Sequence, residues 1–176
     1  MEKQSAPTSK LANKFLGIGL AIALAVIVPV VPLLQGYSAQ ISSAELERAG
    51  VAVHREMRVV LQEIQRHRGS TAALLSGKEA FRERADKARA GVDAALSKSD
   101  AALLANAAQL GKDEAWDKFK AGWQRLRTEY ASLKPAESVK QHNELIAILM
   151  TAMEVIADHS GLVLDPELIT FYSMSI

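Results

Sequence analysis

The sequence predicts an all-α protein: an elongated up-down four-helix bundle anchored in a membrane, with a fifth helix begun at its C-terminus. Three observations support this prediction. Alanine, leucine and long charged residues dominate the chain, and its 176 residues include only 5 prolines. No segment alternates apolar and polar residues with the β-branched enrichment of a strand. Instead, apolar residues recur at steps of three and four between glycine and proline breaks.

The first element is an apolar segment, Phe15–Leu34, without any charged or hydrogen-bonding side chain. As a helix it spans roughly 30 Å, the thickness of a bilayer's hydrocarbon core. The lysines before it predict a cytoplasmic N-terminus over 1–14, an uncleaved signal anchor in the inner membrane over 15–35, and a periplasmic remainder. A cleaved secretory signal is disfavoured, because the apolar run is longer than that of a signal peptide. In addition, cleavage after Ala39 would place bulky Tyr37 at a position of the cleavage site that requires a small residue.

Four helices are predicted in the periplasmic part of the chain, as a helical bundle over residues 36–164. The first runs from about residue 38 to residue 76, where Gly77 can adopt the left-handed conformation that ends many helices. The second runs from about residue 78 to residue 110 and stops at Gly111. Its stripe is rich in small residues, which let a neighbouring helix approach closely: Phe81, Ala85, Ala88, Val92 and Ala95.

The third helix is expected from about Asp113 to Lys134, because Pro135 disfavours helical geometry in the residue before it. Its apolar stripe comprises Trp116, Phe119, Trp123, Leu126, Tyr130 and Leu133. The capping-box spacing of Ser138 and Gln141 predicts the start of the fourth helix. That helix has a stripe of its own: Val139, His142, Ile146, Leu149, Met153 and Ile156.

A fifth helix is predicted to start within residues 165–176 and to be cut off at Ile176. Asp165 can cap its N-terminus, and Pro166 suits the first helical position. We assign both residues a structural role.

The first helix carries a cation in its predicted apolar stripe. Steps of four and three place Arg68 at a core position, in the series Met57, Leu61, Ile64, Arg68, Thr71 and Leu75. A guanidinium cannot shed its charge, so this side chain must reach solvent, pair with an internal carboxylate, or bind an anion. In the last case Arg68, Ser70 and Thr71 form a small-anion site, with Arg55 or Arg66 adding positive potential.

Gly69 is unusual in a helix interior, where glycine costs about 1 kcal/mol relative to alanine. We interpret it as permitting a close approach by a neighbour or a ligand. The histidines lack the Glu-x-x-His spacing of di-iron bundles, so we expect neither a metal nor a cofactor. His142 is expected to be a hydrogen-bonded core residue.

Composition and motifs also exclude several functions. The formal net charge is +1 without a basic stripe, so no nucleic-acid partner is expected. With no cysteine in the chain, disulfides, thiolate metal sites and cysteine nucleophiles are excluded. The sequence contains no nucleophile elbow, phosphate loop, metalloprotease motif or paired catalytic carboxylates, so we expect no enzyme.

Two segments together resemble a known family: "LQEIQRHRGSTAALLSG" and "HNELIAILMTAMEVIADHSGLVLDPELITFYSM". They are similar to the periplasmic sensor region of bacterial transmembrane receptors, especially methyl-accepting chemotaxis proteins, of the nitrate- and nitrite-sensing-like helical type. The resemblance covers most of Val51 to Met174. It depends on Gln65, Arg68 and Gly69 in the first segment, and on residues 160–166 in the second.

The resemblance implies the ligand-sensing part of a chemoreceptor or related signal-transduction receptor, forming a homodimer and binding a small anion such as nitrate or nitrite. It also implies further sensor helices, a second span and an output domain beyond this chain, which is therefore expected to be a fragment or truncated product. Ligand binding would bias a small helix shift passed through the membrane helix. The alternative is a signal-anchored scaffold or interaction protein of the cell envelope.

Overall fold

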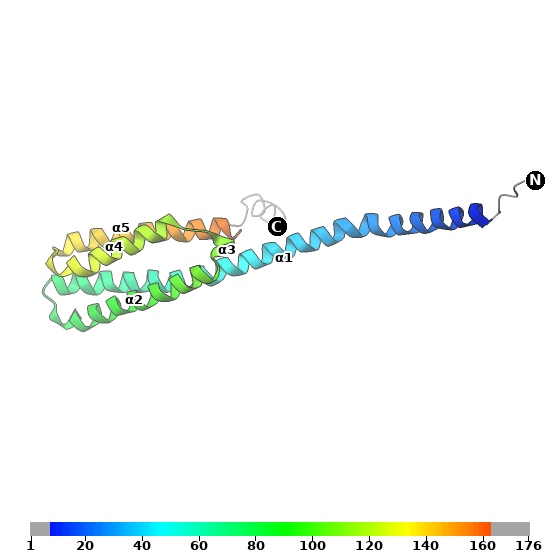
Figure 1. The fold of residues 1–176 in the computed structure, drawn as a ribbon. Helices are drawn as coiled ribbons and strands as arrows, with labels where there is room; N and C mark the ends of the chain where they lie inside the picture. Colours follow the sequence, from blue (N-terminus) through cyan, green and yellow to red (C-terminus); the bar gives the residue numbers. More distant parts are fainter. Residues whose placement is uncertain (1–7, 163–176) are drawn as a thin grey trace, which may run out of the picture. The chain divides into compact units, whose positions relative to one another are not determined.

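The computed structural model describes residues 8–162, and over that range its regular elements are all helices (Figure 1). The predicted all-α class is confirmed. The chain divides into two compact units, Met1–Ser42 and Ser43–Ile176. Asp165 and Pro166, with the predicted fifth helix, lie outside the described residues.

Helix α1, Thr8–Leu75, contains the apolar N-terminal segment and runs through Pro29 and Pro32. In the first unit its described side chains are exposed. Among the described helices, α1 alone is long and apolar enough to cross a membrane. The sequence predicted a separate helix from residue 38. α1 instead continues through this position without a break, and the Ser38 hydroxyl donates to the Gln35 carbonyl, 2.9 Å away, within the same helix.

In the second unit the C-terminal part of α1 lies beside α2, and α4 lies beside α5 (Figure 1). The elements after α1 are η1 (Glu79–Phe81), α2 (Arg82–Ala105), α3 (Ala107–Leu110), α4 (Glu114–Glu129), η2 (Tyr130–Ser132) and α5 (Pro135–His159). The predicted second helix is therefore divided into three elements, and the predicted third ends in a 3-10 turn.

Local chemistry explains most of the helix ends. Gly77 has a φ of 88°, as predicted, and the N–H of Lys78 donates to the Ala73 carbonyl at 3.1 Å. Asp113 caps α4, because its carboxylate accepts from the N–H of Ala115 at 2.8 Å. The predicted start of the fourth helix at Ser138 is wrong. Helix α5 instead begins at Pro135. Proline is tolerated in the first turn, because the N–H groups there have no partner within the helix.

Helices α1, α2, α4 and α5 share one hydrophobic core. Its largest fully buried side chains are Trp123, Phe119, Met57, Ile64, Leu126, Leu149 and Ile156. The stripe predicted for α4 is buried from Trp116 to Tyr130, and that for α2 from Ala85 to Ala95. Fully burying such side chains contributes about 1.5–3 kcal/mol each, so this core is the main source of stability.

Two polar clusters of the same kind join α2 to α4. In each, a tryptophan and a cation of α4 share one aspartate of α2: Trp123 and Arg127 with Asp93, and Trp116 and Lys120 with Asp100. Each indole Nε1 lies 2.8 Å from its aspartate oxygen, and the two cations lie at 3.0 and 3.1 Å. The earlier aspartate meets the later tryptophan, so α2 and α4 run in opposite directions.

Glycine permits close helix contacts at positions that the sequence analysis did not select. A Cβ on Gly50 would overlap Oγ and Cβ of Ser160, and a Cβ on Gly122 would overlap Leu145 Cδ2. A Cβ on Gly91 would lie 2.7 Å from Glu63 Oε2. By contrast, a Cβ on Gly69 meets no described atom within 4 Å. The neighbour predicted for Gly69 is therefore absent from the described residues.

Gly50→Ala and Gly69→Ala should change stability in opposite directions. The first forces a methyl group into Ser160 and should lower the free energy of unfolding by about 1–3 kcal/mol. The second places a methyl group in open space and should raise it by about 0.5–1 kcal/mol, through the better helix propensity of alanine. Thermal unfolding followed by circular dichroism measures both. Equal shifts for the two variants would contradict the contact at Gly50.

Candidate functional site

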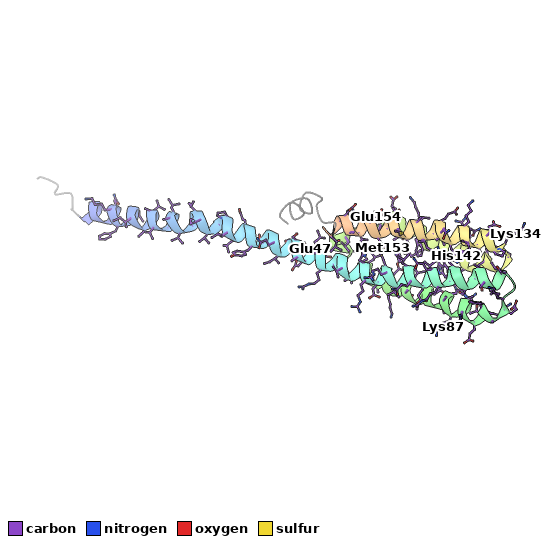
Figure 2. All side chains as sticks on the ribbon, turned by 180° about the vertical axis from the view of Figure 1, so that it is seen from behind. Glu47, Lys87, Lys134, His142, Met153 and Glu154 are labelled. Carbon is purple, nitrogen blue, oxygen red and sulfur yellow. The ribbon has the colours of Figure 1, made fainter. Side chains whose placement is uncertain are left out.

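Two histidines join α1 to α5 in the interior of the second unit. His67 and His142 are both 0% exposed, and Nδ1 of His67 lies 2.8 Å from Nε2 of His142. Figure 2 shows His142 among the packed helices. The expectation that His142 is a hydrogen-bonded core residue is confirmed. The burial of His67 was not predicted, because the sequence placed the buried stripe one residue away.

The hydrogen-bond partners of this pair assign its protons. Nδ1 of His142 lies 2.6 Å from the Ser138 carbonyl, which can only accept, so Nδ1 carries the hydrogen and Nε2 is an acceptor. Nδ1 of His67 must then donate to that Nε2. Nε2 of His67 is left to accept from the Thr71 hydroxyl at 3.3 Å. Every ring nitrogen is therefore satisfied when both histidines are neutral.

Aromatic rings enclose His67. It forms T-shaped contacts with Trp123 and Tyr130, with centroid distances of 5.1 and 5.2 Å. Burial lowers the pKa of His67 to about 3, and the positive charges of His142 and Arg89 act in the same direction. Burial also lowers the pKa of His142. The pair is therefore a neutral polar link at physiological pH.

Arg68 is not at a core position, contrary to the prediction. The buried positions of α1 follow Val53, Met57, Val60, Ile64, His67, Thr71 and Leu74. Arg68 is half-buried beside this stripe. Residues 59–61 are all apolar. The sequence was therefore compatible with a buried stripe through Leu61 and Arg68 and with one through Val60 and His67. The structure buries Val60 and leaves Leu61 at the edge of the core.

The partner of Arg68 is an amide. Its Nη1 donates to Oδ1 of Asn143 on α5 at 2.6 Å. Within residues 8–162 its guanidinium forms no ion pair with a carboxylate. The internal carboxylate considered in the sequence analysis is thus not found in this range. The positive charge also helps to lower the pKa of neighbouring His142, after burial and against the Ser138 carbonyl, which raises it.

The other predicted ligand residues do not converge on Arg68. Thr71 is buried against His67, and the Ser70 hydroxyl donates to the carbonyl of Arg66 at 2.8 Å. Arg66 forms an ion pair with Glu63, and together with Ser70 it faces a groove beside α2. Arg55 is exposed, at a separate groove near Ala157 and Leu162.

Asn143 is the functional candidate that sequence reasoning missed, since only the packing of α5 against α1 reveals it.

Within the described range, no three histidine, aspartate or glutamate side chains are placed to hold a metal ion.

The comparison with protein families gave one result. The family model described as nitrate and nitrite sensing matches residues 59–175, a range that contains the histidine pair, Arg68 and Asn143. This confirms the resemblance predicted from the sequence. Neither the curated proteins nor the solved structures contain a match to the chain.

Proposed function

The chain belongs to the nitrate and nitrite sensing family, and on this premise we propose that it is the periplasmic sensing part of a transmembrane receptor, with a nitrate or nitrite ion bound at Arg68. The receptor is a chemoreceptor or a related signal-transduction protein. The chain binds and reports the anion and does not transform it.

The observation that supports this site is the amide partner of Arg68. A guanidinium paired with a carboxylate would have to break that ion pair before accepting an anion, whereas Asn143 leaves its positive charge uncompensated. The planar fork of N–H donors matches two oxygens of a planar anion. The Asn143 amide nitrogen adds donors at the same place.

The proposed architecture follows from the same helices. The apolar segment of α1 spans the inner membrane with residues 1–14 in the cytoplasm, and α1, α2, α4 and α5 form an elongated up-down four-helix bundle in the periplasm. A homodimer is the functional unit. Arg68 and the apolar segment belong to one helix, so an anion that shifts α1 against α5 at Asn143 acts on the element that enters the membrane.

Arg68→Gln should abolish stabilisation by nitrate without unfolding the protein. For the unchanged chain in detergent, nitrate at a hundred times its dissociation constant should stabilise the fold by about 2.7 kcal/mol. The variant should show no shift in melting temperature with nitrate. Without ligand it should unfold within about 1 kcal/mol of the unchanged chain, because no buried carboxylate loses its partner.

Arg58→Gln is the matched control, because Arg58 is an exposed arginine of the same helix. Its response to nitrate should equal that of the unchanged chain. A nitrate shift that persists in Arg68→Gln would remove Arg68 from the site. If nitrate and nitrite give no shift even in the unchanged chain, the sensing proposal itself fails.

A further inference from the structure

A second basic site lies on the opposite side of α1 from Arg68. A groove of about 560 Å³ runs between α1 and the start of α2. We name it the basic groove; its lining is Glu63, Arg66, Ser70, Phe81, Arg84, Lys87, Ala88 and Gly91. Arg68 instead faces α5, where it binds Asn143. The two sites therefore share a helix but no side chain.

The charges of the basic groove are largely uncompensated. Arg66 is paired with Glu63, so those two charges offset each other. Arg84 and Lys87 form no ion pair with any carboxylate in the described range. Figure 2 shows Lys87 on the outer side of the packed helices. The lining thus carries two unmatched positive charges, which attract an anion and repel a second copy of the same surface.

The groove also has apolar residues beside these charges, Phe81 and Ala88. The guanidinium of Arg84 lies over the ring of Phe81, 5.3 Å from its centroid. Ala88 and Gly91 of α2 add little side-chain bulk to the wall. A Cβ at Gly91 would lie 2.7 Å from Oε2 of Glu63, so the glycine leaves room for this carboxylate at the wall of the groove. An apolar group can therefore contact Phe81 and Ala88 while a charged end reaches Arg84 and Lys87.

The size of the groove distinguishes its ligand from that of the Arg68 site. A volume of about 560 Å³ falls in the range of pockets that bind organic molecules, roughly 300–1,000 Å³, and an ion of four atoms would fill little of it. We propose that the basic groove binds an organic carboxylate with a planar apolar group. Lys87 and Arg84 hold its carboxylate, and Phe81 and Ala88 contact its apolar part.

The test uses the full chain in detergent and isothermal titration calorimetry with benzoate as the probe. Benzyl alcohol keeps the ring without the charge, and acetate keeps the charge without a ring. Benzoate should bind at least about tenfold more tightly than either, because only benzoate satisfies both parts of the groove. Arg84→Gln and Lys87→Gln should each weaken benzoate binding about tenfold or more. Phe81→Leu should reduce the advantage of benzoate over acetate.

Lys98→Gln is the control, since Lys98 is an exposed lysine of α2 away from the groove. Its affinity for benzoate should match that of the unchanged chain. The proposal is overturned if benzoate does not bind, if acetate binds equally well, or if the Arg84 and Lys87 variants bind benzoate as tightly as the control. None of these results bears on nitrate binding at Arg68, which is measured separately.

Discussion

Acidification from pH 8 to pH 4 should lower the free energy of unfolding by about 3 kcal/mol through His67 alone, at about 1.4 kcal/mol per pKa unit. The folded protein keeps His67 neutral down to a pKa of about 3, whereas the unfolded chain protonates it near 6.5. Above pH 6.5 this group favours neither state. As the pH falls from 6.5 towards 3, only the unfolded chain takes up the proton, so stability is lost across that window.

His142 acts in the same direction, since its pKa is also lowered in the folded state. Denaturant unfolding of the full chain in detergent, repeated at each pH, measures the loss. His67→Gln removes the titrating group, and the slope between pH 6.5 and 4 should become shallower in this variant even if its stability at pH 8 is lower. An unchanged slope in His67→Gln would show that other groups cause the acid sensitivity.

Trp123→Ala should be among the most damaging single substitutions, lowering the free energy of unfolding by about 3–5 kcal/mol. The Trp123 side chain is 0% exposed, packs edge-on against His67, and donates to Asp93. Its removal leaves a cavity next to a polar pair and deprives an aspartate of one of its partners. Denaturant unfolding followed by helical circular dichroism measures the change.

Two further variants separate volume from hydrogen bonding. Trp123→Phe keeps most of the apolar volume but loses the indole N–H, and should cost about 1–3 kcal/mol. Leu104→Ala removes a side chain that is 80% exposed and should stay within about 0.5 kcal/mol of the unchanged chain. A loss for Trp123→Ala as small as that for Leu104→Ala would exclude Trp123 from the core.

The sequence predicted those features that depend on neighbouring residues. Gly77 and Asp113 end and begin helices through backbone geometry and capping, which are local effects. The stripe of α4 was unambiguous because its large apolar residues are separated only by polar or small ones. In α1, the apolar run over 59–61 permitted two stripes. The choice between them depends on the side chains of α4 and α5 that contact α1, such as Trp123 and His142.

The site depends on contacts between distant parts of the chain. His67 and His142 are 75 positions apart, as are Arg68 and Asn143, and no periodicity within one helix relates them. A capping box was predicted at Ser138 because its spacing to Gln141 fits one. In the structure the Ser138 carbonyl instead accepts from His142, one turn later. Only the assembled helices select between these roles.

The two aspartate–tryptophan pairs between α2 and α4 have a consequence for the register of the two helices. If α4 slid by one heptad in one direction, Trp116 would lie opposite Ala107 and its indole N–H would lose its acceptor. Such a buried unpaired donor costs about 1–3 kcal/mol. If α4 slid in the other direction, Trp116 would meet Asp93. Trp123 would then meet Asp86, which lies one heptad before Asp93. Hydrogen bonding alone therefore permits this second register.

Steric fit at α5 disfavours it. Gly122 lies where a Cβ would overlap Leu145, and the same slide would bring Ala115, one heptad earlier in α4, to that position. The methyl group of Ala115 would then collide with Leu145. A glycine without a hydrogen-bonding side chain thus favours one of two alignments that satisfy the tryptophan–aspartate pairing equally, and Gly122 contributes to the register of α4.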